Sequence, residues 1–167
     1  VYYQGRTYID TPGQSTKKFP SKYDVRFGSA HWVYNIDAAR KSSVPTILVV
    51  ESILNVLSLK KELAARSIDY VEPIAVFKHH ISPIQAKKIA ALRHVKEICM
   101  LYDADSVAAA KKEALKFMGI RRMSVIEMPY TPEGKTQDAN DNASLAVDLF
   151  LKRKFFDSVD LIDTANL

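Results

Sequence analysis

Five carboxylates stand after apolar runs of the chain and are its strongest candidates for chemistry: Glu51, Asp103, Asp105, Asp138 and Asp141. Carboxylates that share a small volume repel one another, and a divalent cation relieves that repulsion. Side chains two positions apart in an extended chain point the same way, about 6 to 7 Å apart at Cα. Both acids of the Asp-Ala-Asp sequence can therefore address one cation. Oxygen ligands with no cysteine nearby favour Mg²⁺ or Mn²⁺ over zinc.

An Asp at the start of a helix is most often only a helix cap. The Asp-Ala-Asp sequence alone is therefore weak evidence for a metal site. Its combination with Glu51, which ends another apolar run, is much harder to obtain by accident. We therefore take Glu51 and the four aspartates as candidates for a site that binds a divalent cation.

The elements that must position these acids alternate between short apolar runs and amphipathic stretches. The runs predict strands at residues 46–50, 73–77, 97–102 and 122–128, and the stretches predict helices at residues 53–65, 82–92, 105–118 and 142–152. Such alternation predicts an α/β fold with about four parallel strands flanked by helices. Ligands of these sheets bind beyond the carboxyl ends of the strands. The predicted sheet therefore brings the acids to one edge.

Basic residues near this edge are candidates for phosphate binding. Lys78 follows the second predicted strand, and Lys135 lies in the polar loop after the fourth. A lysine ammonium in either place can pair with a nucleotide phosphate. His79 and His80 follow Lys78, and we interpret this pair as solvated loop residues rather than ligands.

The first 45 residues hold most of the net charge of +5, with seven Lys and Arg against three Asp. Aromatic residues are interleaved with these cations, a composition that suits single-stranded nucleic acid. We expect Lys17, Lys18, Lys22 and Arg26 to bind it. The alternative is a small β lobe whose aromatic residues form a core.

The length of 167 residues supports one substantial core with a small attachment. We expect a basic, β-containing N-terminal segment at residues 1–45, an α/β domain at 46–155 and a tail at 156–167. A single cysteine, Cys99, excludes an internal disulfide and a zinc ribbon, and indicates a reducing compartment. No apolar run approaches the ~18 residues of a membrane span, so the expected location is cytoplasmic.

Several stretches resemble a known family. ILVVESILNVLSL resembles the first Toprim motif, a strand that ends in Glu, and ICMLYDADSVAAAKKEA resembles the second, a strand that ends in Asp-x-Asp. HWVYNIDAARK, ISPIQAKKIAAL and EGKTQDANDNA are similar to segments before, between and after these motifs in bacterial and phage DnaG-type primases. The resemblance covers roughly residues 31–152 and implies a Toprim-like fold.

The resemblance also implies a reaction: metal-dependent nucleotidyl transfer on a DNA template, which is RNA primer synthesis. Asp103 and Asp105, with Asp138 or Asp141, would hold Mg²⁺ or Mn²⁺, and Glu51 would ligate the metal or act as acid and base. The implied partners are single-stranded DNA template and nucleoside triphosphates, with a replicative helicase as a further candidate. The chain begins at Val1, so we expect a fragment that primes poorly by itself.

The sequence departs from the family pattern at several positions. Ser52 replaces the usual Gly after the Glu, Asn55 replaces an Asp, and Ala104 replaces a Gly. Asn55 adds no charge, which predicts a weaker metal site. These departures leave two alternatives open: a Toprim nuclease, which uses a similar acidic cluster for hydrolysis, and a degenerate module of a phage or mobile element that binds nucleic acid without chemistry.

Overall fold

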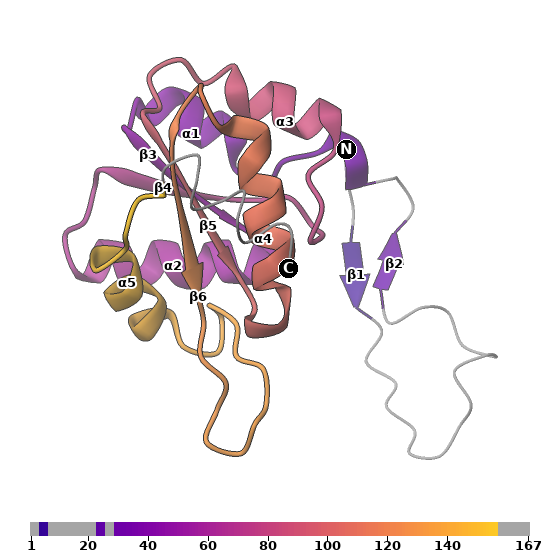
Figure 1. The fold of residues 1–167 in the computed structure, drawn as a ribbon, viewed down its shortest axis with the longest axis vertical. Helices are drawn as coiled ribbons and strands as arrows, with labels where there is room; N and C mark the ends of the chain where they lie inside the picture. Colours follow the sequence, from indigo (N-terminus) through magenta and orange to yellow (C-terminus); the bar gives the residue numbers. More distant parts are fainter. Residues whose placement is uncertain (1–3, 7–22, 26–28, 157–167) are drawn as a thin grey trace.

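The computed structural model describes residues 4–6, 23–25 and 29–156, with side chains from residue 30 (Figure 1). The strands are β1 (Gln4–Arg6), β2 (Tyr23–Val25), β3 (Thr46–Val50), β4 (Val71–Ala75), β5 (Glu97–Tyr102) and β6 (Arg122–Glu127). The α-helices are α1 (Ile36–Ser42), α2 (Ile53–Ala65), α3 (Pro83–Ala90), α4 (Val107–Ala114) and α5 (Ala143–Leu151). Three short 3₁₀ helices are η1 (Ser29–His31), η2 (Ala104–Ser106) and η3 (Leu115–Phe117).

Four strands form one parallel sheet in the order β4-β3-β5-β6. The central strands β3 and β5 are buried along their whole length. Strands of a parallel sheet are apolar throughout because helices cover both faces. The prediction of an α/β fold with a four-stranded parallel sheet is thus confirmed.

Helices cover both faces of the sheet, and each face has its own core (Figure 1). On one face α1, α3 and α4 contribute Ile36, Ala39, Ile89 and Ala110, which pack on alternate strand residues. On the other face α2 and α5 contribute Val56, Leu59, Leu63 and Phe150. The alternation of side chains along each strand divides the two cores. The carboxyl edge of the sheet therefore lies between two rigid helical layers.

The element bounds follow the sequence pattern closely, with three exceptions. The strand predicted at 73–77 is β4, which begins two residues earlier and carries Pro73 on an edge of the sheet, where proline is tolerated. The helix predicted at 105–118 is divided into η2, α4 and η3, and Gly119 follows at a φ of 77°. The short helix α1 is not among the helices predicted from the sequence. Its neighbour Tyr34 pairs with Ala75 on the edge of β4.

Two helices are rotated from the phase that their apolar residues suggest. In α2, Leu54 and Leu57 are 56% and 50% exposed, whereas Val56 and Asn55 are buried. In α3, Ile84 is exposed and Gln85 is buried. The Gln85 amide donates to the backbone carbonyls of Trp32 at 2.7 Å and Val76 at 2.9 Å. Hydrogen bonds to neighbouring loops thus outweigh apolar burial at this position.

The N-terminal segment is described only in part. β1 and β2 pair antiparallel, with Gln4 opposite Val25. Lys17, Lys18, Lys22 and Arg26 lie outside the described residues, so their role stays a prediction. Val33, Ile36 and Ala39 belong to the core of the sheet although they precede residue 46, and the expected domain boundaries also stay predictions. No helix among the described residues is long and apolar enough to cross a membrane.

Candidate metal and phosphate site

Glu51 stands at the carboxyl end of the central strand β3, and its side chain is 13% exposed. Ser52 then caps α2, because its hydroxyl accepts from the backbone N–H of Asn55 at 3.1 Å. Glu51 Oε1 accepts from the backbone N–H of Asp103 at 3.4 Å, and Oε2 lies 2.9 Å from His79 Nδ1. The carboxylate of Glu51 therefore links the ends of three neighbouring strands.

The Asp-Ala-Asp sequence is not extended. Asp103 follows β5 with extended backbone angles, but Ala104–Ser106 form the 3₁₀ turn η2, closed by the Ser106 N–H to the Asp103 carbonyl at 2.9 Å. The expectation that both side chains point the same way from an extended chain is therefore wrong. Asp105 is exposed, and its Oδ1 accepts from Ser106 Oγ at 3.1 Å. The turn forms because Asp105 already begins the connection to α4.

Burial and the repulsion between the acids of the cluster act together on Asp103. Burial, followed by the negative charges of Glu51, Asp138 and Asp105, raises the pKa of Asp103 to about 7, and His79 acts in the opposite direction. Burial alone can raise the pKa of a carboxyl group, and neighbouring negative charges raise it further. Glu51, Asp105 and Asp138 are therefore near enough to Asp103 for their charges to act on it.

Asp141 behaves differently from the other four acids, because it serves the loop between β6 and α5. Its N–H donates to Asp138 Oδ1 at 2.9 Å, and its own Oδ2 accepts from the Asp138 N–H at 3.4 Å. Asn140 also donates its N–H to Asp138 Oδ1, at 2.7 Å, and its side-chain carbonyl accepts from Ser58 of α2. These bonds hold Asp138 beside the sheet edge. The roles of Asp138 and Asp141 as ligands stay predictions.

The loop after β4 brings further polar groups to the same edge. Phe77 has a φ of 68°, and Lys78, His79 and His80 after it are exposed. The carboxylate of Glu113 in α4, 3% exposed, accepts from the Ile81 N–H at 2.8 Å and lies 3.3 Å from His80 Nδ1. The buried anchor on Glu113 fixes the course of this loop and places Lys78 at the site edge.

His79 is the functional candidate that the sequence interpretation passed over. Its Nδ1 contacts Ser106 Oγ at 2.9 Å in addition to Glu51. The interpretation of both histidines as merely solvated is therefore incomplete, since each has a carboxylate partner. The available signal is position: His79 follows a strand end, where ligands of such sheets gather. Lys135 is exposed in a tight turn, where the Thr131 N–H donates to its carbonyl at 2.8 Å.

Two buried polar atoms near the cluster have no hydrogen-bond partner among the described residues. One is the hydroxyl of Tyr102, the last residue of β5, and the other is Oδ1 of Asn55 in the first turn of α2. Burial, followed by the charges of Glu113 and Glu51, raises the pKa of Tyr102 above its usual value. Asn55 is the residue that replaces an acid of the Toprim pattern. Its burial shows that this position faces the protein interior.

The donor chemistry at this edge suits a hard divalent cation. Carboxylate oxygens dominate, no cysteine is near, and the crowding of negative charge that raises the pKa of Asp103 is what a cation relieves. Among the described residues, no three His, Cys, Asp or Glu side chains are already arranged around one point. A bound cation would therefore draw the carboxylates together from their present positions.

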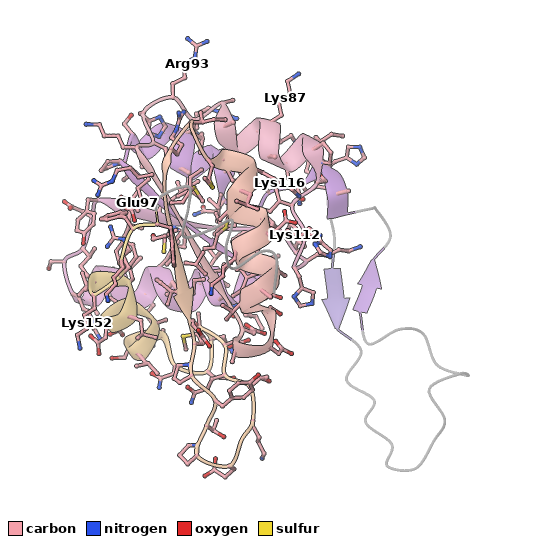
Figure 2. All side chains as sticks on the ribbon, in the orientation of Figure 1. Lys87, Arg93, Glu97, Lys112, Lys116 and Lys152 are labelled. Carbon is pink, nitrogen blue, oxygen red and sulfur yellow. The ribbon has the colours of Figure 1, made fainter. Side chains whose placement is uncertain are left out.

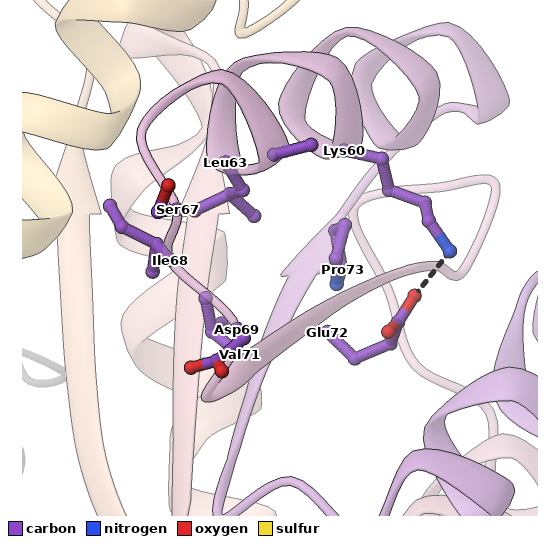
Figure 3. A pocket seen from close by; sticks show the side chains of 9 residues that line it. Lys60, Leu63, Ser67, Ile68, Asp69, Val71, Glu72 and Pro73 are labelled. Carbon is purple, nitrogen blue, oxygen red and sulfur yellow. Dashed lines mark hydrogen bonds and ion pairs between the residues drawn. The ribbon is translucent and has the colours of Figure 1, made fainter.

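The cavity in Figure 3 lies elsewhere. It has a volume of about 460 Å³ and lies between the end of α2 and the start of β4. The ion pair that Figure 3 marks joins Lys60 Nζ to Glu72 Oε1 at 2.6 Å, and Asn35 Nδ2 donates to the same oxygen. The two charged residues of the cavity, Lys60 and Glu72, thus already neutralise each other. The cavity also lies at the amino end of the sheet, away from the carboxylates. The carboxylate edge remains the better candidate.

No protein-family model and no curated protein matches the chain. Solved structures do: one described as the DnaG primase catalytic domain bound to single-stranded DNA (TM-score 0.62, 17% identity), and one described as the DnaG catalytic core (TM-score 0.61, 15% identity). Each alignment covers 93% of this chain and 48% or 49% of the other, so the chain spans about half their length. The chain has the fold of a DnaG-type Toprim domain.

Proposed function

We propose that the chain carries the metal site of a primase-type nucleotidyltransferase, which makes RNA primers on a single-stranded DNA template. The observation that carries the proposal is the contact of Glu51 with the backbone of Asp103 at the carboxyl edge of a Toprim fold, where the charges of Asp105 and Asp138 also act on Asp103. Charge crowded to this degree is costly unless the site binds a cation. Phosphoryl transfer needs such neutralisation at the reacting phosphate.

In this proposal each acid has a role that follows from its position. Asp103 and Asp105, with Asp138 or Asp141 from the following loop, would hold Mg²⁺ or Mn²⁺, which when bound neutralises the triphosphate and the charge that develops during transfer. Glu51, whose side chain is 13% exposed, would ligate the metal or accept the proton of the attacking hydroxyl. Lys78 and Lys135 would pair with phosphate oxygens from the two adjacent loops.

A second candidate, a module that binds nucleic acid without chemistry, is favoured by one observation. Asn55 is buried where the Toprim pattern has an acid, and its Oδ1 has no partner among the described residues. Loss of one negative charge lowers affinity for a divalent cation. The two candidates differ in one measurable property, which is turnover that depends on Glu51.

The test incubates the chain with Mn²⁺ and labelled single-stranded DNA, with and without ribonucleotides. Products longer than the added nucleotides, absent with Glu51→Gln, support primer synthesis. Shortened DNA that also requires Glu51 would instead establish a Toprim nuclease, and retention of DNA with no product would establish the binding module.

Metal binding is measured separately by calorimetric titration with Mn²⁺. We expect the Asp103→Asn/Asp105→Asn double variant to lose binding. Asp69→Asn is the matched control, because Asp69 is exposed and lines the cavity at the other end of the sheet. Unchanged Mn²⁺ affinity in the double variant would remove the metal site from the proposal.

A further inference from the structure

We infer that the outer face of helices α3 and α4 binds single-stranded nucleic acid and leads it to the carboxylate edge. The inference rests on the proposed function for the class of ligand. Residues 78–122 hold ten Lys and Arg against four Asp and Glu. The prediction from the sequence placed the nucleic acid on the N-terminal segment, so this surface is a second and separate one.

The four acids of this segment are all removed from the outer face. Glu97 is 7% exposed and paired with Arg153, and Glu113 is 3% exposed and paired with Lys116. Asp103 and Asp105 belong to the candidate site. The described outer surface of α3, α4 and the following 3₁₀ helix η3 therefore displays five lysines and no carboxylate: Lys87, Lys88, Lys111, Lys112 and Lys116.

Most of these cations have no ion-pair partner among the described residues. Lys87, Lys111 and Lys112 make no salt bridge there, and neither do Lys78 and Arg93 at the two ends of the surface. Figure 2 shows Lys87 and Arg93 extending away from the molecule, with Lys112 on α4 and Lys116 on η3, which continues α4. Unpaired cations on one face attract a polyanion and release its counterions on binding.

The opposite face of the sheet is different in composition. At α2 and its C-cap, Lys60 pairs with Glu72, and Arg66 pairs with both Glu62 and Asp148, which leaves Lys61 as the lysine of α2 without a salt bridge to any described residue. Helix α5 carries no lysine or arginine. The two faces carry similar helices over the same sheet, so solubility alone does not require this asymmetry. Among these described helices, α3 and α4 carry four lysines without a salt bridge, against one on α2 and none on α5.

An exposed aromatic residue beside α3 indicates a single strand. Trp32 is 39% exposed, and Lys88 Nζ lies 5.5 Å from the centre of its ring. Gln85 of α3 holds the Trp32 carbonyl at 2.7 Å. Bases of a single strand stack on such rings, whereas the bases of a duplex are already stacked.

The surface is continuous with the candidate site. α4 begins at Val107, two residues after Asp105, and the loop that carries Lys78 and His79 is anchored on Glu113 of α4. Lys116 also donates to the carbonyl of Ile81 at 2.6 Å, in the connection between β4 and α3. A strand that follows the lysines of α4 towards its first turn therefore arrives at the acids.

The test measures binding of labelled single-stranded DNA to the full chain by fluorescence anisotropy at several salt concentrations. The triple variant Lys87→Ala/Lys111→Ala/Lys112→Ala should bind at least about tenfold more weakly. Its salt slope should be shallower by about 2, since each neutralised phosphate contributes about 0.7 for a single strand. The matched control, Lys61→Ala/Lys152→Ala/Lys154→Ala, removes the same charge from exposed positions of the α2 and α5 side and should retain affinity.

Trp32 is the only tryptophan of the chain, so its fluorescence reports on this surface directly. Single-stranded DNA should quench it, duplex DNA of the same length should quench it less, and the triple variant should need more DNA for the same effect. Quenching that persists in the triple variant at unchanged affinity would overturn the inference.

Two further outcomes would also overturn it. One is loss of binding only when Lys17, Lys18, Lys22 and Arg26 are neutralised, which would assign the strand to the N-terminal segment. The other is loss by the triple variant of binding to phosphatidylserine vesicles but not to DNA, which would assign the face to a membrane.

Failure of the proposed function is separable from failure of this inference. Glu51→Gln should leave DNA affinity and Trp32 quenching unchanged. If no Glu51-dependent product forms while the triple variant still loses DNA, the surface stands and the enzyme proposal falls. If Glu51-dependent synthesis persists and the triple variant binds DNA normally, the enzyme proposal stands and the inference about the surface of α3 and α4 falls.

Discussion

His79 Nδ1 lies 2.9 Å from Glu51 Oε2, and Ser106 Oγ approaches the same nitrogen at 2.9 Å. Glu51 and His79 are 28 positions apart in the sequence. They meet because Glu51 follows β3 and His79 follows β4, and these two strands are neighbours in the sheet. The contact fixes one oxygen of Glu51, while the other faces the backbone of Asp103. His79 is therefore in a position to orient the residue that the proposed reaction requires.

Replacement of His79 should lower the rate without weakening DNA binding. Partners that orient a metal-site residue typically contribute 10- to 100-fold, so His79→Gln should reduce kcat of Glu51-dependent synthesis by about that factor. His80→Gln is the matched control, since His80 is 74% exposed and its carboxylate partner is Glu113 rather than Glu51. Equal losses in the two variants would show that the loop, and not the contact with Glu51, matters.

The pKa of Asp103 predicts a pH dependence of stability in the metal-free chain. Its rise from 3.8 to about 7 in the folded state means that folding favours the protonated acid. The resulting stability is fully present below about pH 4, declines as the pH rises and is lost above about pH 7.

Asparagine imitates the protonated acid and does not titrate, so it isolates this effect. The free energy of unfolding of Asp103→Asn, minus that of the unchanged protein, should increase from pH 5 to pH 8 in urea titrations without metal. Saturating Mn²⁺ should diminish the increase, because a cation stabilises the ionised form. A difference that stays constant with pH would show that Asp103 titrates normally.

The ion pair of Glu97 and Arg153 predicts a large effect on stability far from the site. Arg153 donates to both oxygens of Glu97, with Nη2 2.7 Å from Oε2, and the two side chains are 11% and 7% exposed. Arg153→Met leaves a buried carboxylate without its cation and should cost about 3 to 5 kcal/mol. The double variant Glu97→Gln/Arg153→Met should recover part of this loss, as measured by chemical denaturation. A single variant as stable as the unchanged protein would contradict the prediction.

The unpartnered hydroxyl of Tyr102 predicts that its removal does not lower the stability of the protein. Tyr102 is 1% exposed, and its oxygen has no hydrogen-bond partner among the described residues. Removal of an unsatisfied buried hydroxyl is neutral or stabilising, so Tyr102→Phe should change the free energy of unfolding by about 0 to +1 kcal/mol. Destabilisation by more than about 1 kcal/mol would indicate a partner such as a bound water.

The sequence by itself determined most of the local structure. β3, β5 and α2 lie at the residues that periodicity predicts, because their apolar patterns belong to short, continuous segments. The start of α3 follows from Ser82 and Pro83, and the structure shows a complete capping box there. The carboxylates at the strand ends were selected because a parallel sheet places those ends on one edge.

Only the tertiary structure decided which distant side chains meet. The contacts of Glu51 with His79, and of Glu97 with Arg153, join residues that no local pattern relates, since they depend on strand order and helix packing. Tertiary packing also decides which face of α2 is buried, since Leu54 is exposed while Asn55 is buried. Net charge shows the point most clearly. Residues after 45 are nearly neutral in sum, yet burial of Glu97 and Glu113 leaves the lysines of α3 and α4 alone on one face.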